Sequence, residues 1–170
     1  MTKTSLRGTC DGKVYYGVWS DLEEQIDLEL ALLGELLDLH RPLFEKCHGE
    51  EPTVIELSAL AATLHSFYSG IENLFKRIAI SLDGAVPSGQ TWHQILLESM
   101  TRPTAGRPAV LSEELRNRLK AYLDFRHVFR NAYLFLLRWN KMAPLVLHCD
   151  ETFEDLSAEL TVFKERMADN

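Results

Sequence analysis

Long apolar stretches are absent from the 170-residue sequence, in which charged and polar residues interrupt every hydrophobic run. No run approaches the roughly 20 apolar residues that a membrane-spanning helix needs. The first residues, MTKTSLRGTCDGK, also lack the apolar centre of a secretory signal. We therefore expect a soluble, cytoplasmic protein that makes no contact with a membrane.

Cysteine is scarce as well. Cys10, Cys47 and Cys149 are too few and too scattered to form a disulfide framework. Two of them adjoin histidines, in the pairs Cys47–His48 and His148–Cys149, which together would supply four metal ligands. The compact ligand spacing of structural zinc sites is missing, however. We expect no metal and no other cofactor.

Common catalytic motifs are missing too. The sequence contains no P-loop, no nucleophile elbow and no HExxH motif. It also shows no internal repeat and no low-complexity linker that would separate two domains. We predict one helical domain over residues 19–170, preceded by a loosely ordered N-terminal segment, residues 1–18, that is rich in glycine and small polar residues.

Helical periodicity dominates the rest of the chain. Apolar residues recur at three- and four-residue steps, and residues 20–23, 53–56 and 91–94 have the pattern of a capping box. We predict an all-α, five-helix bundle with short connections. Its helices run from about Ser20 to Cys47, from Thr53 to Leu82, from Thr91 to the turn RPTAGRP, from Ser112 to just before Pro144, and from Thr152 to Met167.

Charge is unevenly distributed. The chain carries a net charge of −7, but the segment 102–141 has nine basic and three acidic residues, a net charge of +6. The remainder therefore carries −13. A basic face on an acidic body attracts a phosphate backbone or an acidic protein partner. An ordinary solvated basic helix fits the same pattern equally well.

The stretch FRHVFRNAY in the fourth predicted helix is unusual. On a helical wheel at about 100° per residue, Arg126 projects from the middle of the apolar stripe and Arg130 lies at its border. His127 and Asn131 fall on the polar side. A buried guanidinium needs a partner. Arg126 either forms an ion pair with a carboxylate such as Glu72, or lies in a cleft where it binds a phosphate.

Two further histidines and one lysine fit structural interpretations. His65 and His93 are predicted to be polar-face or satisfied core histidines rather than ligands. Glu72 and Lys76 are spaced as an i, i+4 pair, which supports a helix by a few tenths of a kcal/mol.

FRHVFRNAY resembles the signature of HepT-type toxins of the HEPN superfamily, which is Arg, four residues, His, one residue, Tyr. Arg126 and Tyr133 match its arginine and tyrosine, and Asn131 stands at the histidine position. SFYSGIENLFKRIAISLDG (66–84) and PSGQTWHQILLESM (87–100) resemble other segments of the family in the expected order. The resemblance extends from about residue 53 to about residue 155.

The resemblance implies a homodimer in which the motif helices of two subunits face one cleft. It also implies metal-independent RNA cleavage, in which the 2′-hydroxyl attacks its own phosphate and leaves a cyclic phosphate end. Arg126 would neutralise the phosphate, position 131 would transfer protons, and Tyr133 would border the cleft. Arg130 would assist with the RNA backbone, and Glu72 would orient Arg126.

A partner is implied as well. HepT proteins are paired with MntA, a nucleotidyltransferase antitoxin that silences them by attaching AMP to the motif tyrosine. The corresponding acceptor in this sequence is Tyr133.

Asn131 is the departure from the family pattern. An asparagine amide donates and accepts hydrogen bonds but cannot exchange a proton near pH 7. Loss of a general acid–base group typically costs roughly 10²–10⁴-fold in rate, so we expect low activity or none. His127 is a candidate replacement, although it lies a full 100° step from Arg126.

The alternative is a non-catalytic helical HEPN module that binds RNA or an acidic protein partner. A second histidine that reaches the Arg126 cleft would favour the enzyme, and a solvent-exposed Asn131 far from Arg126 in either subunit would favour the module.

Overall fold

The structure, a computed structural model, describes the backbone of residues 11–131 and 136–169, and side chains except those of residues 11–16 and 131. Within these residues every regular element is helical, which confirms the all-α class. The elements are α1 (Asp11–Lys46), α2 (Val54–Ile78), the π-helical turn η1 (Ala79–Asp83), α3 (Trp92–Ser99), α4 (Glu113–Asn131), α5 (Trp139–Leu147) and α6 (Cys149–Ala168). In this part of the chain no helix is long and apolar enough to cross a membrane.

The helix count differs from the predicted five. The single fourth helix predicted to reach Pro144 is wrong, because α4 ends at Asn131 and α5 begins at Trp139. Arg138, which precedes α5, has an extended backbone with φ −131° and ψ 126°. Pro144 lies inside α5 rather than after a helix. Apolar spacing continues on both sides of the break, so periodicity alone gives no sign of it.

The first helix starts earlier than predicted. It begins at Asp11 rather than near Ser20, and the apparent capping box SDLE lies inside α1. Of the remaining predicted starts, those at Thr53 and Ser112 are confirmed. The capping box at residues 91–94 is wrong, because Thr91 makes no side-chain cap hydrogen bond, and the last helix begins at Cys149 rather than at Thr152. In α2, Thr53 Oγ1 accepts from the backbone N–H of Glu56, whose carboxylate accepts from the backbone N–H of Thr53. Ser112 Oγ accepts from the N–H of Leu115, 3.1 Å away, at the start of α4.

Replacement of Thr53 by alanine is expected to lower the free energy of unfolding by about 1 kcal/mol, because it removes one half of the capping box. Urea unfolding followed by circular dichroism measures the change. Thr161→Ala, at an exposed site in the middle of α6, is the control and is expected to stay within about 0.5 kcal/mol. Equal effects of the two substitutions would contradict the capping role.

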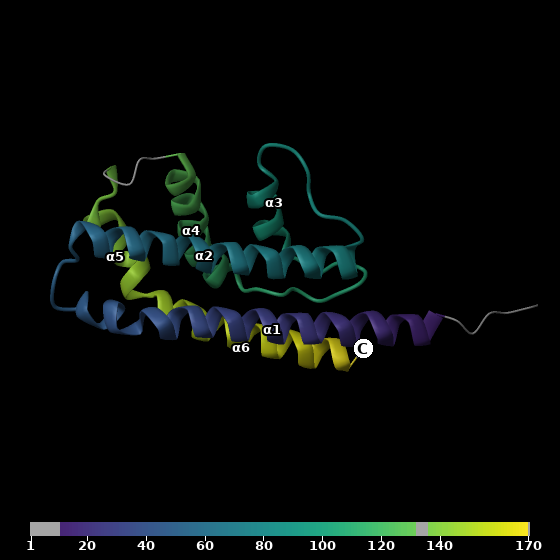
Figure 1. Cartoon of the computed structure of the whole chain (residues 1–170). Coiled ribbons are helices and arrows are strands. Elements are labelled where there is room, and N and C mark those ends of the chain that lie inside the picture. The colour runs from purple at the N-terminus through teal and green to yellow at the C-terminus, as the bar shows by residue number, and fades with distance from the viewer. Residues whose placement is uncertain (1–10, 132–135, 170) are drawn as a thin grey trace, which may run out of the picture.

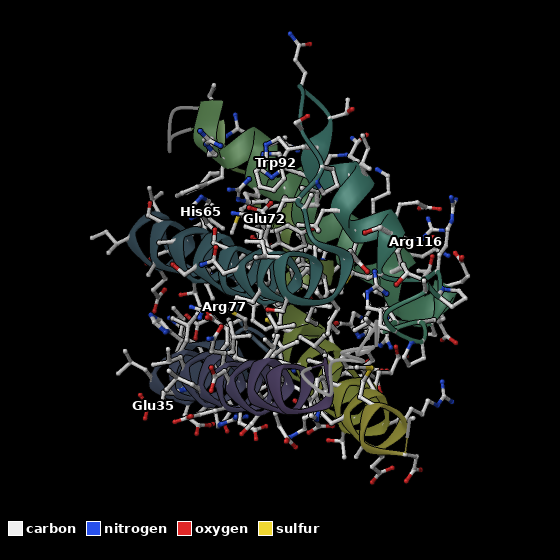
Figure 2. All side chains as sticks on the ribbon, turned by 90° about the vertical axis from the view of Figure 1, so that its right-hand side faces the viewer. Glu35, His65, Glu72, Arg77, Trp92 and Arg116 are labelled. Carbon is white, nitrogen blue, oxygen red and sulfur yellow. The ribbon has the colours of Figure 1, made fainter. Side chains whose placement is uncertain are left out.

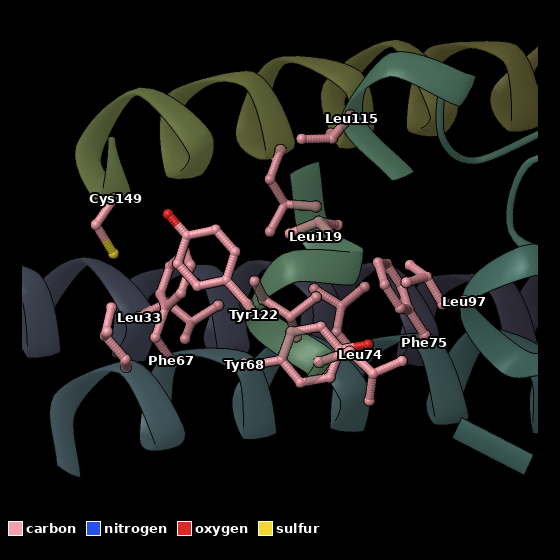
Figure 3. Packing of buried hydrophobic residues seen from close by; sticks show 14 of the residues in the cluster. Leu33, Phe67, Tyr68, Leu74, Phe75, Leu97, Leu115, Leu119, Tyr122 and Cys149 are labelled. Atoms are coloured by element: carbon pink, nitrogen blue, oxygen red, sulfur yellow. The ribbon is translucent and has the colours of Figure 1, made fainter. Parts of the chain in front are cut away.

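The helices form two sets that cross (Figure 1). α1 and α2 lie side by side, α6 runs along α1, and α4 crosses α2. Aromatic and leucine side chains fill the space between them, among them Phe67 and Tyr68 from α2 and Leu119 and Tyr122 from α4 (Figure 3). Tyr122 also donates a hydrogen bond to the carbonyl of Leu145, 2.8 Å away. This packing fixes α2 against α4, the two helices that carry Glu72 and Arg126.

A buried arginine secures the connection between α3 and α4. The side chain of Arg107 is 0% exposed and donates to Asp83 Oδ2 from Nε at 3.1 Å and from Nη2 at 2.8 Å. It also donates to the carbonyls of Ser99, Arg102 and Pro108. The connection is thereby held against η1 and against the end of α3.

Candidate functional site

The site is built around one buried carboxylate. Glu72, on α2, is 2% exposed. Its Oε1 lies 3.3 Å from Nη2 of Arg126 on α4 and 3.2 Å from Nζ of Lys76. Its Oε2 contacts Nδ1 of His93 on α3. Three helices therefore meet at Glu72, which Figure 2 shows close to Trp92.

Arg126 is the least satisfied member of this group. Its side chain is 11% exposed, and its Nε donates to Ser69 Oγ at 3.4 Å. Nη1 is buried and has no hydrogen-bond partner among the residues that the structure describes. A guanidinium carries five N–H donors, and unsatisfied buried donors are rare and costly. The structure thus contains the ion pair with Glu72 and, in addition, one buried arm of Arg126 whose donor capacity is unused among the described residues.

Three imidazoles surround this arginine. The ring of His93 lies 3.6 Å from that of Trp92 and 5.3 Å from that of His127, measured between centroids. The rings of His93 and His127 are inclined at 80°, an edge-on arrangement. His65 packs against Phe129, with centroids 5.1 Å apart. This arrangement brings His93 and His127 together near Arg126.

Burial sets the protonation of His93. Loss of solvent lowers its pKa below the ordinary value, Arg126 and His127 lower it further, and Glu72 opposes them. Lys76 and Arg126 already balance the Glu72 carboxylate, so a charged His93 would add an excess positive charge in a buried place. His93 is therefore neutral near pH 7, with Nδ1–H donating to Glu72 and the lone pair on Nε2.

The protein is expected to lose stability when the pH falls below about 6.5, the ordinary pKa of histidine. Burial lowers the pKa of His93 and of His65 in the folded state. The unfolded chain therefore binds protons first, and acidification favours unfolding until the folded pKa values are passed. Urea unfolding at pH 7.5 and 5.5 measures this loss.

His93→Gln is expected to reduce that acid-induced loss, whereas His148→Gln, at an exposed site, leaves it in place. A protein that gains stability on acidification over this range would contradict the burial of neutral imidazoles.

The structure places the other predicted site residues as follows. Arg130 is exposed near His65, whose pKa its charge helps to lower. His127 is partly buried beside His93 rather than on an open polar face. The side chain of Asn131 and the whole of Tyr133 lie outside the described residues. Their proton-transfer and AMP-acceptor roles remain predictions.

Two contributions were missed by sequence reasoning. The sequence predicted that His93 is a polar-face or core residue, and it is indeed buried, but against Glu72 beside Arg126. Lys76 does more than support its own helix, since it also lies over the Trp92 ring at 4.7 Å. One signal was available: positions 65, 69, 72 and 76 recur at three- and four-residue steps, so their polar side chains share one face of α2.

The basic segment is largely neutralised within the fold. Among the described residues at least six of its nine basic residues pair with carboxylates: Arg102 with Glu98, Arg107 with Asp83, Arg116 with Glu113, Arg118 with Asp155, Lys120 with Asp124, and Arg126 with Glu72. A broad basic face is therefore a weaker argument for an RNA or acidic partner than the net charge of the segment suggested.

The two Cys–His pairs do not form a metal site in the described part of the chain, where no three His, Cys, Asp or Glu side chains are grouped to hold a metal ion. Cys47 and Cys149 are buried free thiols. Burial raises the pKa of Cys149 to about 12, so this thiol is protonated and unreactive near neutral pH.

Comparison with known proteins identifies the family. No curated protein and no solved structure matches the chain. The family model described as HepT-like protein matches residues 59–167, a range that runs from within α2 into α6 and contains Glu72, His93 and Arg126. This match covers well over half of the chain and confirms the resemblance seen in the sequence. The chain belongs to the HepT-like proteins of the HEPN superfamily.

Proposed function

We propose that this HepT-like protein is the toxin of a toxin–antitoxin pair and cleaves RNA without a metal ion. The observation that carries the proposal is the guanidinium of Arg126, which is almost buried, is anchored on Glu72, and has Nη1 without a hydrogen-bond partner among the described residues. A phosphodiester oxygen is the kind of acceptor that such a donor binds.

The chemistry is the attack of an RNA 2′-oxygen on the adjacent phosphorus. Negative charge grows on the non-bridging oxygens in the transition state, where donors fixed in advance contribute most. Glu72 and Ser69 hold one side of Arg126, so Nη1 is oriented before RNA binds. Because Asn131 stands at the motif histidine position, the unmodified chain is expected to turn over slowly.

The proposal includes two partners. Positions 126 and 131 point about 140° apart on a straight helix, so a cleft that uses both is completed by a second copy of the chain or by a local distortion of α4. We assign the first arrangement, a homodimer. The other partner is an MntA-type nucleotidyltransferase antitoxin, which would attach AMP to Tyr133. Both assignments rest on the family membership.

The test compares the unmodified chain with Asn131→His, each incubated with total tRNA in EDTA and examined for cyclic phosphate ends. The histidine version is expected to cleave at least about 100-fold faster. When Arg126→Ala is added to Asn131→His, cleavage is expected to slow by about 10²–10³-fold, because one donor to the developing oxyanion is removed.

Arg41→Ala is the matched control, since Arg41 lies on α1 and pairs with Asp38 and Asp150 at the surface. Its rate is expected to be unchanged. If neither the unmodified chain nor Asn131→His cleaves RNA while both are folded, the enzyme is excluded and the non-catalytic interaction module takes its place.

A further inference from the structure

We propose that His93 is a catalytic residue and acts as the general base of the site, so that slow proton transfer persists although Asn131 cannot perform it. The inference rests on the proposed RNA cleavage and adds to it a residue outside the FRHVFRNAY motif. It also predicts that the unmodified chain retains measurable activity.

The ring of His93 is anchored on Glu72. Glu72 Oε2 accepts from Nδ1 of His93, so the carboxylate fixes both the orientation of the imidazole and its tautomer. The remaining nitrogen, Nε2, then carries a lone pair. A carboxylate that holds one ring nitrogen while the other exchanges a proton is a recurrent arrangement in proton-transfer catalysis.

One carboxylate anchors both Arg126 and His93. Glu72 Oε1 binds Arg126 from α4, and Oε2 binds His93 from α3. The phosphate-binding group and the base are therefore fixed relative to each other through a single buried residue. Such positioning before substrate binding is what an efficient reaction requires.

Two neighbouring rings hold the imidazole of His93 in place. His93 is stacked on Trp92 and in edge contact with His127, yet 9% of its side chain is exposed, close to the 11% of Arg126. Both side chains are thus largely buried, each with a small exposed part, and packing holds their positions.

The charged and titratable groups around His93 suit a base. Glu72 and Lys76 face it from α2, and Arg126 and His127 face it from α4. With Glu72 balanced by two cations, the imidazole is neutral near pH 7 and its lone pair is available. The lowered pKa of His93, caused first by burial, agrees with this state.

The step balances as follows. Nε2 of His93 takes the proton of the RNA 2′-hydroxyl while the 2′-oxygen bonds to phosphorus. The bond from phosphorus to the 5′-oxygen breaks, and that oxygen takes a proton from water. The imidazolium then returns its proton to the hydroxide that remains. The products are a 2′,3′-cyclic phosphate and a 5′-hydroxyl, with no change in oxidation state.

The test measures steady-state RNA cleavage in EDTA between pH 5 and 9 by the unmodified chain and its variants. His93→Gln is expected to lower kcat by at least about 100-fold, to leave KM for RNA nearly unchanged, and to abolish the decline in rate at acidic pH. His127→Gln tests the rival base and is expected to cost less and to keep the acidic decline. His148→Gln, at an exposed site, is the matched control.

The outcomes separate the inference from the proposed function. Cleavage that is retained in His93→Gln, or that appears only after Asn131→His, overturns the role of His93 and leaves the ribonuclease intact. Cleavage by neither the unmodified chain nor Asn131→His removes the ribonuclease itself, and the role of His93 with it. A loss of the acidic decline in His127→Gln instead would transfer the role to His127.

A second measurement tests the same role if the His93→Gln variant fails to fold. Nitrogen-15 NMR of the histidines in the unmodified protein reports which ring nitrogen carries the proton. The Nδ1–H tautomer is expected for His93 at pH 7.5. A proton on Nε2 alone would leave no lone pair for the RNA hydroxyl and would overturn the inference.

Discussion

Replacement of Glu72 by alanine is expected to lower the free energy of unfolding by about 3–5 kcal/mol, the usual cost of removing one partner from a buried ion pair. Arg126, Lys76 and His93 all lose their shared acceptor, and Arg126 is left as an unpaired charge that is only 11% exposed. Urea unfolding at pH 7.5 and low salt measures the loss. Because α2, α3 and α4 meet at this residue, the effect reaches beyond a single helix.

Two variants bracket this result. Glu72→Gln keeps the shape and one acceptor oxygen but removes the charge. It is therefore expected to lower the free energy of unfolding by less than Glu72→Ala does. Asn73→Ala changes the exposed neighbouring residue on α2 and is expected to stay within about 0.5 kcal/mol. If Glu72→Ala is as stable as Asn73→Ala, the buried carboxylate does not organise the site.

The helical class and half of the site could be predicted from the sequence for local reasons. The capping box at Thr53 depends on residues three apart, and the structure contains it. The wheel position of Arg126 in an apolar stripe required a buried partner, and Glu72 is that partner. Both inferences need only the geometry of one helix and the cost of burying a charge.

The other half depends on tertiary contacts that no local pattern encodes. His93 belongs to α3, and only the packing of that short helix against α2 brings its ring to Glu72. The break between α4 and α5 was missed for a related reason. The apolar spacing continues through it, and the extended backbone of Arg138, directly before α5, is not encoded in that spacing.

Placing His93 depends in turn on the connection after α3, where Arg107 is the anchor. Arg107→Ala is expected to lower the free energy of unfolding by about 3–5 kcal/mol. Asp83 would lose the cation that it pairs with, and three backbone carbonyls would lose their hydrogen-bond donor. Arg107→Lys is expected to recover little of this, since an ammonium cannot reproduce the planar fork that reaches Asp83 and the carbonyls together.

Arg102→Ala is the matched control, because Arg102 lies in the same connection. Its side chain is exposed and, among the described residues, pairs only with Glu98 at the surface. The substitution is expected to lower the free energy of unfolding by no more than about 0.5 kcal/mol. Amide hydrogen exchange shows which helices are destabilised. In Arg107→Ala the amides of α3 are expected to exchange faster than those of α1, because the end of α3 loses its attachment to η1. Uniform acceleration across both helices would mean that Arg107 stabilises the whole bundle rather than the position of α3, and hence of His93.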